Sequence, residues 1–138
     1  MGKMPIVIIG LLLSAGCGAP PRAFQNVRPG AGHAIVYVYR PSQNAAGSDE
    51  GLGIFCDRLK VAALKPGGYI YIEVPVGYHA ISSTTEATVQ VSLDAREGRS
   101  YFIEVATEPG FSVARPRLKI VPEEQGRIEI VNTKYFGP

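Results

Sequence analysis

The stretch Tyr69–Val74 reads YIYIEV and decides the fold class. Ile70, Ile72 and Val74 fall on one face of an extended chain, whereas two tyrosines and a glutamate fall on the other. Apolar residues that alternate with polar ones at a period of two are typical of a strand with one side in the core. This stretch therefore predicts a sheet that buries one of its faces.

Further stretches of strand character lie on both sides of it. His33–Arg40 (HAIVYVYR) is rich in β-branched and aromatic residues, and Thr88–Leu93 (TVQVSL) repeats the alternation. Turns rich in proline and glycine separate such runs at roughly 8–12-residue intervals, as in sandwiches and barrels. We expect an all-β, antiparallel β-sandwich, immunoglobulin- or transthyretin-like, with about seven or eight strands. It should occupy residues 33–132, with a C-terminal tail over 133–138.

Two connections carry specific expectations. Asp57-Arg58 stands between two strand-like runs and predicts a tight hairpin, although the dipeptide lacks the glycine that such turns favour. No stretch has the apolar period of a helix, so no helix is expected. The last two strands are predicted on either side of a turn at Glu123–Gly126, around Leu118 with Ile120 and around Ile128 with Ile130.

The composition fits a folded domain and argues against nucleic-acid binding. Of the 138 residues, 46% are hydrophobic and 19% are charged, a balance that supports a core and does not suit a disordered chain. The formal net charge is only +2, and lysines and arginines form no cluster, whereas binding a phosphate backbone needs several cations together. We expect one domain that does not bind nucleic acid.

The N-terminus has the composition of an export signal. A lysine precedes the apolar run Ile6–Leu13, which is shorter than the roughly 20 residues of a membrane-spanning helix. The following Leu13–Cys17 (LSAGC) resembles the lipobox of bacterial lipoproteins, with Ser14 where an aliphatic residue is usual. This resemblance implies a signal peptide over residues 1–16 and a membrane anchor through lipid on Cys17.

The resemblance also implies an address. Gly18 stands where enterobacterial lipoproteins of the inner membrane carry an aspartate, which favours the outer membrane with the domain facing the periplasm. Residues 17–32 are rich in proline and glycine and are expected to form a flexible tether. The alternative is an ordinary signal peptide that is cut near Ala15 or Ala19, with Cys17 incidental.

The cysteines and histidines give little sign of chemistry. If Cys17 carries lipid, Cys56 has no partner for an intramolecular disulfide. His33, Cys56 and His79 lack the close spacing of zinc ligands, so no metal or other cofactor is expected. A Cys56 nucleophile with His79 as its base is the alternative, but the neighbouring Asp57 would raise the thiol pKa. We expect a buried structural Cys56, a hydrogen bond from His79 to a turn, and no enzymatic activity.

Tyrosine is the most frequent aromatic residue, with seven tyrosines against no tryptophan. Tyr69, Tyr71 and Tyr78 gather around one region of turns, and Tyr37 and Tyr39 line one side of the first strand. If exposed, such side chains form an aromatic patch of the kind that protein partners use. The first three are the candidate partner-binding residues; the alternative is that these tyrosines cover the edge of the core.

An ordered set of motifs carries a family resemblance, in the segments Ala34–Pro41, Val61–Leu64, Gly68-Tyr69, Gly77–His79 and Gly98–Phe102. Together they look like the bacterial lipoprotein family known as domain of unknown function 2846, from about residue 33 to 107 and more weakly to 131. Arg58 replaces the glycine that usually follows the hairpin aspartate in this family. The resemblance implies the lipoprotein address and the fold, and it transfers no active site.

These observations lead to an expected function and two alternatives. We expect a non-enzymatic domain, held in the cell envelope by lipid on Cys17, that binds another envelope protein through a strand edge, a loop or the tyrosine face. One alternative is a carrier or sensor of a small hydrophobic ligand, which requires an apolar cavity of about 300 Å³ or more. The other is an accessory lipoprotein of a secretion system, because small transthyretin-like lipoproteins have a similar plan.

Overall fold

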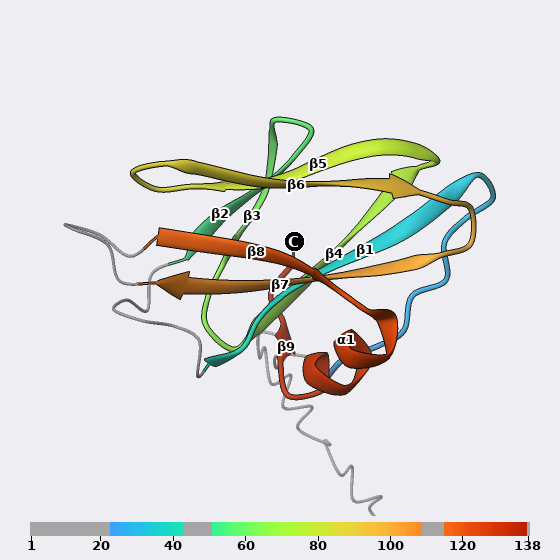
Figure 1. Ribbon diagram of the computed structural model, residues 1–138. Coiled ribbons are helices and arrows are strands. Elements are labelled where there is room, and N and C mark those ends of the chain that lie inside the picture. The colour runs from blue at the N-terminus through green and yellow to red at the C-terminus, as the bar shows by residue number, and fades with distance from the viewer. Residues whose placement is uncertain (1–22, 43–50, 109–114, 138) are drawn as a thin grey trace, which may run out of the picture.

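The computed structural model describes residues 23–42, 51–108 and 115–137. Within these residues the chain forms nine strands and one helix (Figure 1). The elements are β1 (His33–Arg40), β2 (Leu52–Cys56), β3 (Leu59–Leu64), β4 (Gly68–Pro75), β5 (Gly77–Thr84), β6 (Thr88–Ala95), β7 (Ser100–Glu108), β8 (Arg115–Val121), α1 (Glu123–Ile130) and β9 (Lys134–Tyr135).

The strands form two stacked sheets, so the predicted β-sandwich is confirmed (Figure 1). One sheet has the order β8-β7-β1-β4-β9, and the other has the order β3-β2-β5-β6. Most neighbours are antiparallel, but β1 pairs with β7 and β4 pairs with β9 in parallel. The sheets are therefore rich in antiparallel pairs without being wholly antiparallel. The described residues contain nine strands, against the seven or eight expected, and β9 has only two residues.

The main core lies between the two sheets and follows the predicted alternation. Ile70 and Val74 of β4 are each 2% exposed, and Ile72 packs against them from a partly buried position. Burying such apolar surface stabilises the fold by about 25 cal/mol per Å². The buried members of this core are Ala34, Val36, Val38, Leu52, Ile54, Leu64, Ile70, Val74, Ile81, Leu93, Ala95, Ile103 and Val105.

A second apolar cluster, here called the outer cluster, lies on the other face of the five-stranded sheet. Its buried members are Ile35, Tyr37, Tyr39, Tyr69, Phe102, Val121 and Ile130. Strand β1 is buried on both faces because its alternate residues, Tyr37 and Tyr39, point into this cluster. The rings of Tyr37 and Phe102 stack with centroids 4.9 Å apart. Helix α1 covers the cluster from the side away from the four-stranded sheet (Figure 1).

Helix α1 replaces the strand that was predicted around Ile128 and Ile130, so that prediction is wrong. Pro122 precedes the helix, and two glutamates occupy its first turn. Their negative charges interact favourably with the positive end of the helix dipole and stabilise the helix. Gly126 and Ile130 are buried four residues apart on one face, whereas Ile128 is 66% exposed. Ile128 and Ile130 therefore do not share a buried face, as alternate residues of a half-buried strand would.

Residues 23–32, expected to belong to a flexible tether, instead lie against the outer cluster. Phe24 and Val27 pack on its tyrosine rings, because a proline- and glycine-rich segment can still dock individual apolar side chains. The Val27 amide donates a hydrogen bond of 2.7 Å to the hydroxyl of Tyr37. The predicted signal peptide and Cys17 lie outside the described residues.

The expected C-terminal tail is also partly structured. Lys134 and Tyr135 form β9 and extend the five-stranded sheet beside β4. Ala23 forms an isolated bridge to Lys134, so the two ends of the described chain meet at this edge. No helix among the described residues has the length and apolar character needed to cross a bilayer.

Candidate functional site

The predicted hairpin at Asp57-Arg58 is confirmed and leads to the first candidate site. Strands β2 and β3 pair on either side of these two residues. Asp57 has φ 49° and Arg58 has φ 73°, so both adopt the left-handed conformation that a type I′ turn requires. Aspartate tolerates this conformation, whereas arginine is strained in it.

Replacement of Arg58 by glycine should therefore stabilise the domain. Glycine adopts positive φ without a Cβ penalty, and the expected gain in the free energy of unfolding is about 1 kcal/mol. Urea unfolding of the two proteins measures it. Gly98→Ala is the matched control: Gly98 has φ 74° with no atom within 4 Å of an added Cβ, so this variant should lose about as much stability. A loss of stability in Arg58→Gly would contradict the claim that Arg58 is strained at positive φ.

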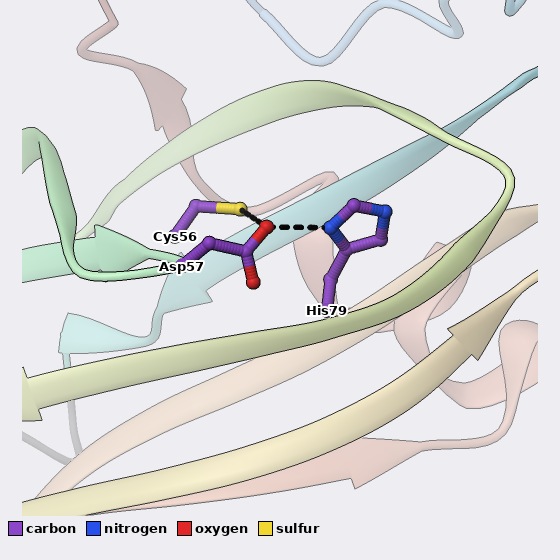
Figure 2. Close-up of side chains that lie close together, drawn as sticks. All are labelled: Cys56, Asp57 and His79. Atoms are coloured by element: carbon purple, nitrogen blue, oxygen red, sulfur yellow. Dashed lines mark hydrogen bonds and ion pairs between the residues drawn. The ribbon is translucent and has the colours of Figure 1, made fainter.

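The turn brings Asp57 against His79, a partner that the sequence did not identify. Nδ1 of His79 lies 2.6 Å from Oδ2 of Asp57, and Sγ of Cys56 lies 3.9 Å from the same oxygen. Figure 2 shows both the sulfur and the imidazole directed at this carboxylate oxygen. The expected hydrogen bond from His79 to a turn is thus present.

The register between β2 and β5 places these side chains. Cys56 pairs with Ile81, and His79 precedes Ile81 by two residues, so His79 and Cys56 lie on the same face. The amide of Asp57 donates to the Ala80 carbonyl, and the Ala80 amide donates to Oδ1 of Asp57, each at 2.9 Å. The strand ends therefore hold the carboxylate in place.

Both ring nitrogens of His79 face acceptors, an arrangement that favours the protonated ring. Nε2 lies 2.6 Å from the carbonyl oxygen of Pro75, and Nδ1 faces the Asp57 carboxylate. A ring that donates from both nitrogens is an imidazolium. The hydrogen bond with Asp57 raises the pKa of His79 against the opposing effect of burial, and the same bond lowers the pKa of Asp57. When the ring is protonated, the two residues form an ion pair.

Cys56 completes this group as a protonated thiol. It is half-buried at the end of β2, where full burial was expected. Burial, and then the charge of Asp57, raise the pKa of Cys56 to about 11. The predicted effect of Asp57 on the thiol is therefore confirmed. His33 lies apart from the group, with Nδ1 2.8 Å from the Ala31 carbonyl oxygen.

The candidate tyrosines do not form one patch. Tyr69 is 2% exposed in the outer cluster, whereas Tyr71 is 38% exposed on the same strand. Tyr78 is 82% exposed but belongs to β5 in the other sheet. Tyr71 stacks on Tyr135 with ring centroids 5.6 Å apart, a partner that the sequence analysis missed. A hollow of about 70 Å³ is lined by Gln25, Val27, Tyr69, Tyr71 and Tyr135.

Comparison with known proteins places the chain in a family. A family model described as protein of unknown function (DUF2846) matches residues 30–115. An uncharacterized protein of Haemophilus influenzae is 28% identical in an alignment 134 positions long, and the alignment covers 91% of this chain and 78% of that protein. The family match spans more than half of the 138 residues and confirms the resemblance of the strand motifs. The chain belongs to the DUF2846 family.

Proposed function

We propose that the chain is a lipoprotein of the outer membrane, facing the periplasm, whose sandwich binds another envelope protein without catalysing a reaction. The observation that carries the proposal is the LSAGC motif at Leu13–Cys17 directly after an apolar run. The Cys17 thiol would receive the diacylglycerol, and two or three acyl chains together anchor a protein stably where one does not.

The edge around Ala23 supports a binding role close to the anchor. Ala23 bridges β9, and the hollow beside Tyr71 and Tyr135 opens at this edge. Phe136 is 42% exposed and donates its amide to the Tyr69 carbonyl, but its ring lies beside Gly68, on the opposite face of the sheet from the Tyr135 ring. Exposed aromatic rings held by a rigid sheet are the groups that interfaces use most. We call Tyr71 and Tyr135, whose rings stack on one face, the edge aromatics.

Two observations favour binding over the other expectations. A thiol whose pKa is near 11 is a poor nucleophile at neutral pH, which disfavours Cys56 as a catalytic group. The hollow of about 340 Å³ on the surface of α1 is lined by Pro122, Glu124, Gln125, Ile128 and Glu129. Its volume exceeds the value of about 300 Å³ set for a ligand carrier, but it lies open on the surface of a helix and does not enclose a ligand as carrier pockets do.

Labelling with radioactive palmitate tests the anchor. The wild-type chain should incorporate label and fractionate with the outer membrane, whereas Cys17→Ala should lose the label, because no other residue offers the lipobox thiol. Cys56→Ala is the matched control and should label like the wild type. Equal labelling of Cys17→Ala and wild type would refute the lipid anchor.

Photo-crosslinking in the same cells tests the binding face. A photoreactive phenylalanine derivative at Tyr71 should give a discrete crosslinked product with an envelope protein. The same group at Ile128, exposed on α1, is the control and should not give that product. Identical products from both positions would contradict binding at the edge aromatics.

A further inference from the structure

We propose that Cys56, Asp57 and His79 form a binding site for one divalent transition-metal ion, with Zn²⁺ as the ion that fits best. A thiol sulfur, a carboxylate oxygen and an imidazole nitrogen of these residues all lie within 4.8 Å of one another. These three ligand types are the ones that bind Zn²⁺ in proteins. The inference concerns the opposite sheet from the edge aromatics and does not depend on the lipid anchor.

The distances are close to those of a tetrahedral site. Bonds of about 2.0–2.3 Å to Zn²⁺ place the ligand atoms about 3.3–3.5 Å from one another. Nδ1 of His79 must therefore move away from Oδ2 of Asp57, from 2.6 Å, and Sγ of Cys56 must approach that oxygen, from 3.9 Å. Each of these two shifts is less than an ångström. The sulfur and the imidazole nitrogen, which lie within 4.8 Å of each other, must also approach to about 3.5 Å. The Asp57 side chain is 47% exposed and leaves an approach from solvent.

Hydrogen bonds around the ligands match those that orient metal ligands elsewhere. A histidine that binds a metal usually donates its other ring N–H to a carbonyl or carboxylate. Here Nε2 of His79 donates to the Pro75 carbonyl at 2.6 Å, so Nδ1 is the nitrogen that faces Cys56 and Asp57. The Ala80 amide holds the second carboxylate oxygen at 2.9 Å. All three ligands are thus fixed by strand ends and a tight turn.

The charges balance when an ion replaces two protons. Before an ion binds, the imidazolium and the carboxylate cancel and the thiol is neutral. Binding would form bonds from the ion to nitrogen, oxygen and sulfur and would release one proton from Nδ1 and one from Sγ to water. The two negative ligands, thiolate and carboxylate, then neutralise the divalent charge. A sulfur and a nitrogen ligand favour Zn²⁺ over Mg²⁺ or Ca²⁺, and water would complete the tetrahedron.

Titration of the full-length chain, purified in detergent and stripped with a chelator, tests the site. The chain should bind one Zn²⁺, and Co²⁺ in its place should give the near-ultraviolet charge-transfer absorption of a cobalt–thiolate bond. Cys56→Ser should abolish this absorption. His79→Gln and Asp57→Asn should weaken Zn²⁺ binding more than the roughly 10–100-fold that follows loss of an outer hydrogen-bond partner.

The control separates this site from adventitious binding. His33→Gln removes the other histidine and should leave Zn²⁺ affinity unchanged. Asparagine tolerates positive φ, so Asp57→Asn keeps the turn even if Cys56→Ser impairs folding, which urea unfolding checks. The proposal is overturned if wild-type protein shows no cobalt–thiolate absorption, if Cys56→Ser retains it, or if His33→Gln weakens binding as much as His79→Gln.

Discussion

Replacement of Gly126 by alanine will lower the free energy of unfolding by about 2–3 kcal/mol, because the added methyl overpacks the contact between α1 and the sheet. A Cβ at this position would lie 2.3 Å from Cγ and 2.4 Å from Cβ of Phe102. At an open site in a helix the same change stabilises by about 1 kcal/mol. The sign is reversed here because the helix must move away from β7. Urea unfolding of both proteins measures the difference.

Glu124→Ala is the control within the same helix. Glu124 is exposed, and the change should alter stability by no more than about 0.5 kcal/mol. If Gly126→Ala were more stable than the wild type, α1 could not lie against Phe102 as described. The pair of variants therefore tests the element that the sequence analysis predicted wrongly.

Tyr37→Ala will have the largest effect, a loss of about 3–5 kcal/mol, which is the cost of truncating a large buried ring. Tyr37 is fully buried and lies between Phe102 and Phe24, with ring centroids 4.9 and 5.3 Å away. Its hydroxyl also accepts the Val27 amide. We expect the variant to unfold at lower urea and to be cleaved by protease within residues 23–32, since their anchor is lost.

Tyr37→Phe separates the ring from the hydroxyl. This variant keeps the stacked ring and loses only the hydrogen bond to Val27, so the expected loss is about 1 kcal/mol. Protease sensitivity of residues 23–32 should rise less than in Tyr37→Ala. Equal losses in both variants would show that the hydroxyl, and not ring packing, fixes the N-terminal segment.

The sandwich could be predicted because its signal is local. In β4 and β6, apolar and polar residues alternate along the strand, and this pattern arises wherever one face of a strand is buried. Strand β1 departs from this pattern, since both of its faces are buried. Its continuous run of apolar residues (AIVYVY) indicated a strand without saying what covers the second face.

The layer that covers this second face could not be predicted from local pattern. Helix α1 has eight residues, and its buried positions, Gly126 and Ile130, are too few to show a helical period. Gly126 was predicted to belong to a turn. In the structure it lies in the helix, where the lack of a side chain leaves room for Phe102. Such a glycine is explained only by the element it contacts. The preceding proline and two glutamates were the signals that could have identified the helix.

The cluster at the hairpin depends on pairing between strands. Asp57 and His79 are 22 positions apart in sequence and meet only through the register of β2 and β5. Motif spacing therefore could not bring Cys56 and His79 together. The aspartate in a predicted hairpin, beside a cysteine, was the available signal, and it indicated the raised thiol pKa without identifying the imidazole.

If Cys17 carries lipid, the docking of residues 23–32 on the sheet would limit how far the domain can lie from the membrane. With lipid on Cys17, only residues 18–22 would separate the anchor from Ala23, and a fully extended chain over that interval reaches about 20 Å. A free tether through residue 32 would reach about 50 Å. The domain would thus stay close to the membrane leaflet that holds its lipid. Its partners would have to lie at that membrane surface, as integral proteins or other lipid-bound proteins do.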